Sequence, residues 1–163
     1  MKRTAFNQLP CSVARTMDLL GDWWTPLVLR EAFYGVRRFD EMQRVLGIAR
    51  NTLADRLARL TAEGLLDRVL YQDKPARHEY VLTEKGRDFF PVLAAMVRWG
   101  DKWLTSEDGA PVHLVHSCGS AAHAKTVCSE CGEPFTADSV RSRMGPGFPA
   151  ELAGKPEVQA RFT

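Results

Sequence analysis

Amide, hydroxyl and guanidinium side chains recur at helical spacing within residues 50–63. Leu53, Leu57 and Leu60 mark the buried side of this segment at about 100° per residue. The polar side chains then lie on the opposite side or its shoulders, where they can bond to base edges and phosphates in a DNA major groove. Asp55 is interpreted as an acceptor for a cytosine amine or as the partner of Arg59 one turn on. The residues predicted to contact DNA here are Arg50, Asn51, Thr52, Asp55, Arg56 and Arg59.

A second basic cluster is predicted at the tip of a hairpin. Residues 65–71 and 79–83 are rich in β-formers and flank the polar loop 72–78. The loop carries Lys74, Arg77 and His78, which we expect to reach a minor groove or the phosphate backbone. Arg38, ahead of another predicted helix, is expected to neutralise a further phosphate. The alternative is that these charges only hydrate an exposed face; their concentration on one helix and one tip favours the DNA interpretation.

Three of the four cysteines lie in the last third of the chain. Cys128 and Cys131 have the spacing of a zinc knuckle, followed by a glycine that lets backbone N–H groups turn toward the sulfurs. Cys118 offers a third thiolate, and His116 or His123 offers a fourth ligand. We predict one structural zinc, closed and without a catalytic role, held by Cys118, Cys128, Cys131 and His116 in a small β-rich, zinc-ribbon-like module. Two alternatives stay open: a disulfide or dithiol pair, and a metal-free β unit.

The remaining cysteine, Cys11, lies immediately before a predicted helix. A helix N-terminus stabilises a thiolate, and Arg15 one turn on adds a positive charge, which is the environment of a redox- or electrophile-sensing thiol. The alternative is an inert cysteine that fills space at a dimer seam.

Helices and one hairpin are predicted to position these side chains. The second helix is expected to begin with Thr25 as N-cap, the third to end at Gly47, and the 50–63 helix to end at a left-handed Gly64. Helical spacing returns after residue 83, where Pro91 predicts a kink or a break. In the first helix, Val13, Met17 and Leu20 are expected to share one side. The residues expected to face inward in the second and third helices are Val28, Leu29, Ala32, Phe33 and Val36, then Phe39, Met42, Val45 and Leu46.

Composition excludes several classes of protein. The 163 residues carry a formal net charge of +2, too small to indicate nucleic-acid binding without local clustering. The first ten residues lack the apolar run of a secretory signal, and no stretch approaches the roughly 20 apolar residues of a membrane helix. We therefore expect a cytoplasmic protein without a membrane contact. The sequence has no phosphate-binding glycine loop, nucleophile elbow or His-Glu-x-x-His helix, so we predict that it is not an enzyme.

Five short motifs resemble the HxlR-type regulators, relatives of the MarR group. They are Cys11–Arg15, Leu20–Thr25, Arg38–Met42, Gly47–Leu53 and Tyr80–Gly86. The resemblance covers about residues 11–104 and implies a homodimeric, sequence-specific DNA-binding protein that represses or activates transcription. It also implies a switching role for the cysteine at the position of Cys11, as in some family members. This chain departs from common versions with Ala49 ahead of the recognition helix and with Trp23 in a Trp-Trp pair.

A winged helix-turn-helix, mainly α with a β-hairpin wing, is therefore the expected fold. Residues 1–104 are predicted to form the DNA-binding and dimerisation domain, 105–111 a linker, 112–144 the Cys/His-containing β module and 145–163 an irregular tail. A stripe of apolar side chains along one helix is expected to pack against a second copy of the chain, because a small domain that exposes such a stripe needs a partner surface. The alternative function is a protein-interaction adaptor without DNA binding; the sequence does not identify an effector. The stripe comprises Phe89, Leu93, Met96, Trp99 and Trp103.

Overall fold

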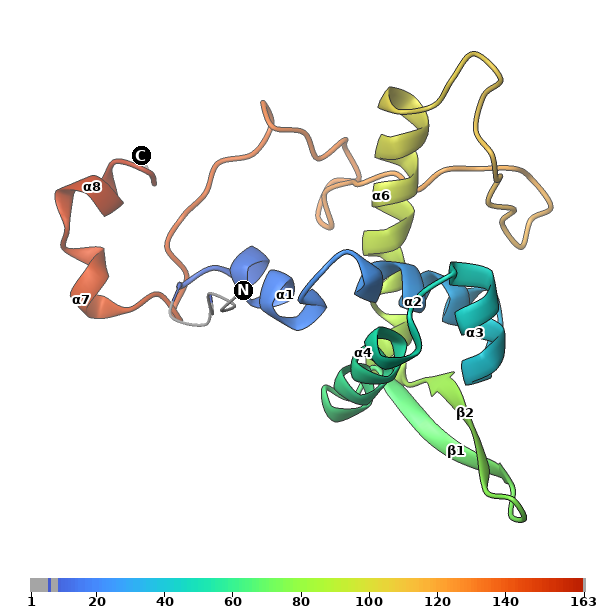
Figure 1. The fold of residues 1–163 in the computed structure, drawn as a ribbon. Helices are drawn as coiled ribbons and strands as arrows, with labels where there is room; N and C mark the ends of the chain where they lie inside the picture. Colours follow the sequence, from blue (N-terminus) through green and yellow to red (C-terminus); the bar gives the residue numbers. More distant parts are fainter. Residues whose placement is uncertain (1–5, 7–8, 163) are drawn as a thin grey trace. The chain divides into compact units, whose positions relative to one another are not determined.

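The computed structural model describes residue 6 and residues 9–162. The chain forms two compact units: one is residues 19–124, and the other comprises the described residues of 1–18 and 125–163. This division differs from the predicted one, which keeps 112–144 together as one module. The elements are α1 (Ser12–Leu20), α2 (Trp24–Phe33), α3 (Phe39–Leu46), α4 (Arg50–Ala62), β1 (Leu66–Gln72), β2 (Arg77–Leu82), α5 (Glu84–Arg87), α6 (Phe90–Trp103), α7 (Ala150–Ala153) and α8 (Pro156–Gln159) (Figure 1).

The core of unit 19–124 is built mainly from α2, α4 and the start of β1. Leu53, Leu57 and Leu60 are fully or almost fully buried, which confirms the predicted inner side of α4. Val45 was predicted to face inward and is instead exposed; Met42 is the fully buried residue of the eight-residue helix α3. The core cluster comprises Leu20, Val28, Leu29, Ala32, Met42, Ile48, Leu53, Leu57, Leu60, Leu65, Leu66 and Leu93.

Helix α2 begins differently from the prediction. The Oδ1 atom of Asp22 accepts hydrogen bonds from the backbone N–H groups of Trp24 (3.0 Å) and Thr25 (3.2 Å), so Asp22 satisfies the first free donors of the helix. Thr25 is completely buried inside the first turn and is not the N-cap. The predicted cap was therefore wrong by two to three residues, because the helix begins at Trp24 and its first N–H groups donate to the carboxylate of Asp22.

A left-handed glycine joins α3 to α4, and another ends α4 before the hairpin. Gly47 (φ +62°) and Gly64 (φ +70°) both adopt the conformation that glycine tolerates without strain. Strands β1 and β2 then pair antiparallel from Leu66↔Leu82 to Gln72↔Arg77, with an irregularity between Leu70 and Gln72. The hairpin projects beyond the helices in Figure 1.

The base of the hairpin is fastened to the start of α3. Arg38 forms an isolated antiparallel bridge with Glu79, and the backbone N–H of Tyr80 donates to the carbonyl of Arg37 at 2.8 Å. The segment before α3 thus runs beside β2 like a short third strand. This arrangement fixes the hairpin relative to α3.

The predicted interruption at Pro91 is confirmed. Helix α5 ends at Arg87 and α6 begins at Phe90 with Pro91 in its first turn, where a missing N–H costs no hydrogen bond. Leu93 packs in the core, so its predicted place on the exposed stripe was wrong. The exposed stripe of α6 consists of Val92, Met96, Trp99 and Trp103, spaced at i, i+4, i+7 and i+11. In α1, Val13 and Met17, which are predicted to share one side of that helix, are also exposed.

The regular strands of a zinc ribbon are not formed between α6 and α7. In this part of the chain the described pairings are two isolated bridges, Val115↔Ala121 and Val127↔Pro134. Across the described residues, no helix combines the length and apolar character needed to span a bilayer.

Candidate nucleic-acid interface

Helix α4 presents its polar residues as two groups. Asn51 and Asp55 are exposed, on the side opposite the buried leucines, as the helical spacing predicts. Thr52 and Arg59 are half-buried on the shoulder of that side. The exposed side is otherwise lined with small alanines, Ala54, Ala58 and Ala62, which leave room for a close approach of another surface.

Arg56 has a structural partner within unit 19–124. Its Nη2 atom forms an ion pair with Oδ2 of Asp22, the same carboxylate that caps α2. The side chains of Arg56 and Asp22 are only 26% and 21% exposed. Arg56 therefore links α4 to the start of α2 through this ion pair. Its predicted DNA contact has no support in the structure.

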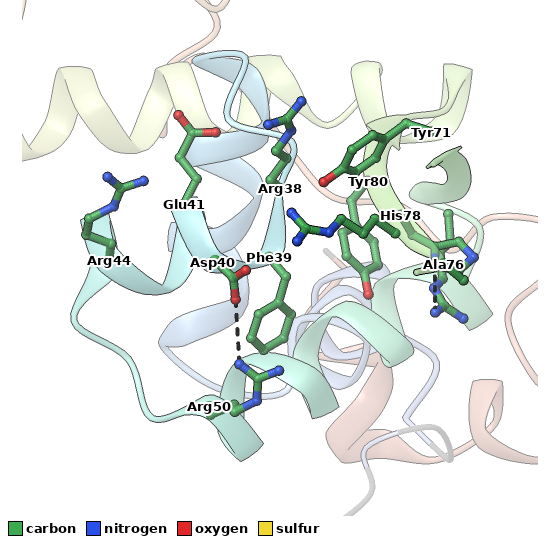
Figure 2. A pocket seen from close by; sticks show the side chains of 12 residues that line it. Arg38, Phe39, Asp40, Glu41, Arg44, Arg50, Tyr71, Ala76, His78 and Tyr80 are labelled. Carbon is green, nitrogen blue, oxygen red and sulfur yellow. Dashed lines mark hydrogen bonds and ion pairs between the residues drawn. The ribbon is translucent and has the colours of Figure 1, made fainter. Parts of the chain in front are cut away.

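A polar hollow of about 610 Å³ opens between the start of α3, the start of α4 and the hairpin. Figure 2 shows its walls, with side chains converging from the helices and from the hairpin. The lining residues are Arg38, Phe39, Asp40, Glu41, Arg44, Arg50, Arg68, Tyr71, Ala76, Arg77, His78 and Tyr80. Five arginines meet two carboxylates here, so the local charge is strongly positive in a chain that is nearly neutral overall.

The hollow brings together some of the predicted contact residues and leaves others outside. Arg38, Arg50, Arg77 and His78 all line it although up to 40 residues separate them in sequence. Lys74 lies at the exposed hairpin tip and is not part of the lining. The predicted contacts of α4 beyond Arg50 also lie outside it.

Sequence reasoning missed eight of the twelve lining residues, among them Arg44, Arg68 and Tyr71. Arg68 stands opposite Tyr80 in the hairpin, and its Nη2 atom lies 3.0 Å from Nδ1 of His78, a pair made when that nitrogen accepts. Tyr71 occupies the irregularity between Leu70 and Gln72. The strand alternation alone offered a weak signal for Arg68, but the pairing register was needed to place it.

Two aromatic rings support guanidinium groups in the hollow. The guanidinium carbon of Arg38 lies 4.6 Å from the centre of the Tyr71 ring, and that of Arg50 lies 4.8 Å from the Phe39 ring. Such cation–π contacts contribute about 0.5–1 kcal/mol at exposed sites. Nη1 of Arg50 also lies 3.5 Å from Oδ1 of Asp40, the pair joined by a dashed line in Figure 2. Both arginines are therefore oriented before any ligand arrives.

The cysteines occupy two kinds of position. Cys11 is exposed and directly precedes α1. Cys128 opens a tight turn in which the N–H of Gly132 (φ +75°) donates to the Cys128 carbonyl at 2.9 Å. Backbone N–H groups of Cys131 and then Glu130 lower the pKa of the Cys128 thiol, because they stabilise its thiolate.

Cys118 lies in another turn with a similar backbone. The N–H of Gly119 (φ +86°) donates to the His116 carbonyl at 2.8 Å, and the pKa of the Cys118 thiol is lowered chiefly by the backbone N–H of Ser120. Thiolates are the form that binds metal. Among residue 6 and residues 9–162, no three His, Cys, Asp or Glu side chains are grouped as metal ligands.

The segment from α3 to β2 has the layout of a winged helix-turn-helix: two helices joined by a glycine turn, then a hairpin wing beside the second helix. Residues 19–108, more than half of the chain, match the HxlR-like helix-turn-helix family. The chain therefore belongs to the HxlR family of helix-turn-helix transcriptional regulators.

Individual relatives agree with this assignment. An HTH-type transcriptional regulator of Mycobacterium tuberculosis is 50% identical over 143 residues, which cover 87% of this chain and 90% of the relative. The crystal structure of PA1607, a candidate transcription factor, matches with a TM-score of 0.78 and 36% identity over 87% of this chain and 100% of its own. The reduced form of the redox regulator HypR matches with a TM-score of 0.53 and 32% identity over 56% of this chain and 92% of its own.

Proposed function

We propose that the protein is a cytoplasmic, homodimeric regulator that binds specific duplex DNA, with α4 in the major groove and the wing on the minor groove or backbone. The hollow carries this proposal. Its five arginines lie at the junction of α3, α4 and the wing, where a DNA backbone passes when the second helix of such a motif enters the groove. In this arrangement Asn51 and Asp55 face base edges, while Arg38, Arg50 and Arg77 contact phosphates.

Binding of duplex DNA across a range of salt concentrations tests the proposal. The probes are the upstream region of the protein's own gene and an unrelated duplex of equal length. We expect selective binding to the first, with an affinity that falls steeply as salt rises, because phosphate contacts release counterions. Weak, sequence-blind binding by folded protein, both reduced and oxidised, would instead favour a protein-interaction adaptor.

The double variant Arg44→Ala/Arg68→Ala examines two of the residues that sequence reasoning missed. We expect a uniform loss of affinity across sequences, about 10-fold to 100-fold at low salt, and a salt slope smaller by about 2, since two phosphate contacts disappear. Lys102→Ala on α6 is the control, because it also removes an exposed positive charge but lies outside the hollow. If Lys102→Ala loses about half as much in log affinity as the double variant, in proportion to the one charge it removes, only net charge matters.

We also propose that Cys11 is a redox-sensing thiol. It is exposed at the start of a helix, and a solved relative is named the redox regulator HypR. Cys11→Ser is expected to bind DNA like the parent when reduced, but to keep its affinity under diamide or a quinone while the parent loses it. Parent protein that is oxidised and then reduced again serves as the control and should regain its affinity, because thiol oxidation to a disulfide is reversible. A Cys11→Ser protein that loses affinity under oxidant would exclude this role.

Zinc binding rests on the Cys128–Cys131 turn. Its glycine and its N–H groups directed at sulfur fit a soft divalent cation, and Cys118 and His116 are the predicted further ligands. Bound zinc would be structural and would stabilise the C-terminal part of the chain. Untagged protein purified without chelator should contain about one equivalent of zinc, and Cys131→Ser should contain much less. Zinc below about a tenth of an equivalent in the parent contradicts this proposal.

A further inference from the structure

Asp40 places a negative charge inside a surface that must receive phosphate. It lies in the first turn of α3 together with Glu41, and both line the hollow with the five arginines. A carboxylate in the first turn of a helix interacts favourably with the helix dipole, which explains why an acid is tolerated there. Glu41 already satisfies that preference, so a second carboxylate at position 40 needs a separate reason.

The reason lies in its partner. Oδ1 of Asp40 is 3.5 Å from Nη1 of Arg50, the first residue of α4, while the Phe39 ring lies under the same guanidinium group. The Asp40 side chain is 85% exposed and that of Arg50 is 69% exposed, so the pair is open to solvent and adds little stability. A DNA phosphate would approach Arg50 from this open side and offer the same kind of anionic oxygen, in a geometry suited to two hydrogen bonds.

We propose that Asp40 is an affinity-determining residue: it holds Arg50 as a substitute for phosphate in the free protein and is displaced by the DNA backbone. This inference rests on the proposed DNA-binding function. Phosphate must replace an existing partner of Arg50, and it must approach a like charge at Asp40. The contact therefore lowers backbone affinity at every sequence alike and leaves base contacts to decide where the protein stays.

The test compares Asp40→Asn with the parent on a short fluorescent duplex of arbitrary sequence, across a range of salt. We expect about fivefold tighter binding at low salt and a smaller gain as salt rises, because the removed repulsion is electrostatic and exposed to solvent. A gain in affinity cannot result from misfolding. Glu41→Gln is the matched control: it makes the same charge change in the same helical turn but breaks no ion pair with Arg50, and its gain should be clearly smaller.

A double-mutant comparison connects the effect to Arg50. In an Arg50→Ala background, Asp40→Asn should produce no more gain than Glu41→Gln does. The inference is overturned if Asp40→Asn binds as the parent or more weakly, or if its gain persists without Arg50. If the parent itself binds no duplex at low salt, the proposed function fails, and this outcome is distinct from the failure of the Asp40 inference.

Discussion

Replacing Gly86 with alanine should destabilise the protein by about 3 kcal/mol or more, the largest effect we expect from any single methyl group. Gly86 is buried in α5, and a Cβ atom there would lie 2.1 Å from the carbonyl oxygen of Leu65 and 3.1 Å from Cδ2 of Leu82. The Leu65 carbonyl cannot retreat easily, because it accepts hydrogen bonds from the N–H and the hydroxyl of Thr83. Urea unfolding monitored by circular dichroism measures the loss in the free energy of unfolding.

Gly100→Ala is the matched control for that experiment. Gly100 lies within α6, and an added Cβ would meet no atom within 4 Å. Because alanine loses less backbone entropy in a helix than glycine, Gly100→Ala should stabilise the protein by about 0.5–1 kcal/mol. The same added methyl group should therefore lower the stability at position 86 and raise it at position 100. A Gly86→Ala protein with an unchanged unfolding midpoint would show that the packing of α5 against Leu65 is looser than described.

Met96→Glu should convert the proposed homodimer to monomers, because Met96 lies within the surface that we expect to form the interface. Met96 lies in the middle of the exposed α6 stripe with Val92, Trp99 and Trp103, while the opposite side of the helix carries the buried Ala94. A carboxylate buried at the centre of an apolar interface loses its hydration without a partner, so we expect the dissociation constant to rise about 100-fold or more. Sedimentation or light scattering across dilutions measures this change.

Val45→Glu provides the comparison for the dimer. Val45 is as exposed as Met96 but lies on α3, so the substitution replaces an exposed apolar residue with the same charge away from the α6 stripe. It should leave the oligomeric state unchanged. Monomers in both variants would indicate a general effect of charge, and a dimer that survives Met96→Glu would place the interface elsewhere than the α6 stripe.

Local sequence patterns were sufficient to predict the elements that carry the proposed DNA-binding face. The leucines of α4 recur at the helical period, so the buried side and the exposed Asn51 and Asp55 followed from spacing alone. The left-handed glycines at 47 and 64 and the break at Pro91 were equally predictable. In each case the controlling interactions involve neighbours within about one helical turn or the conformational range of a single residue.

Tertiary packing determines which side chains distant in sequence contact one another. By its spacing Arg56 belongs to the polar residues of α4, yet in the structure it forms an ion pair with Asp22, 34 positions away. Spacing placed Leu93 on the exposed stripe, whereas packing buries it and leaves Val92 outside. Arg68 enters the hollow because the strand register sets it opposite Tyr80 and beside His78. The helical and strand periods determine which side of an element is polar. The side chains that meet across two elements depend on how the helices cross and how the strands are registered, and contacts between residues far apart in the chain set both.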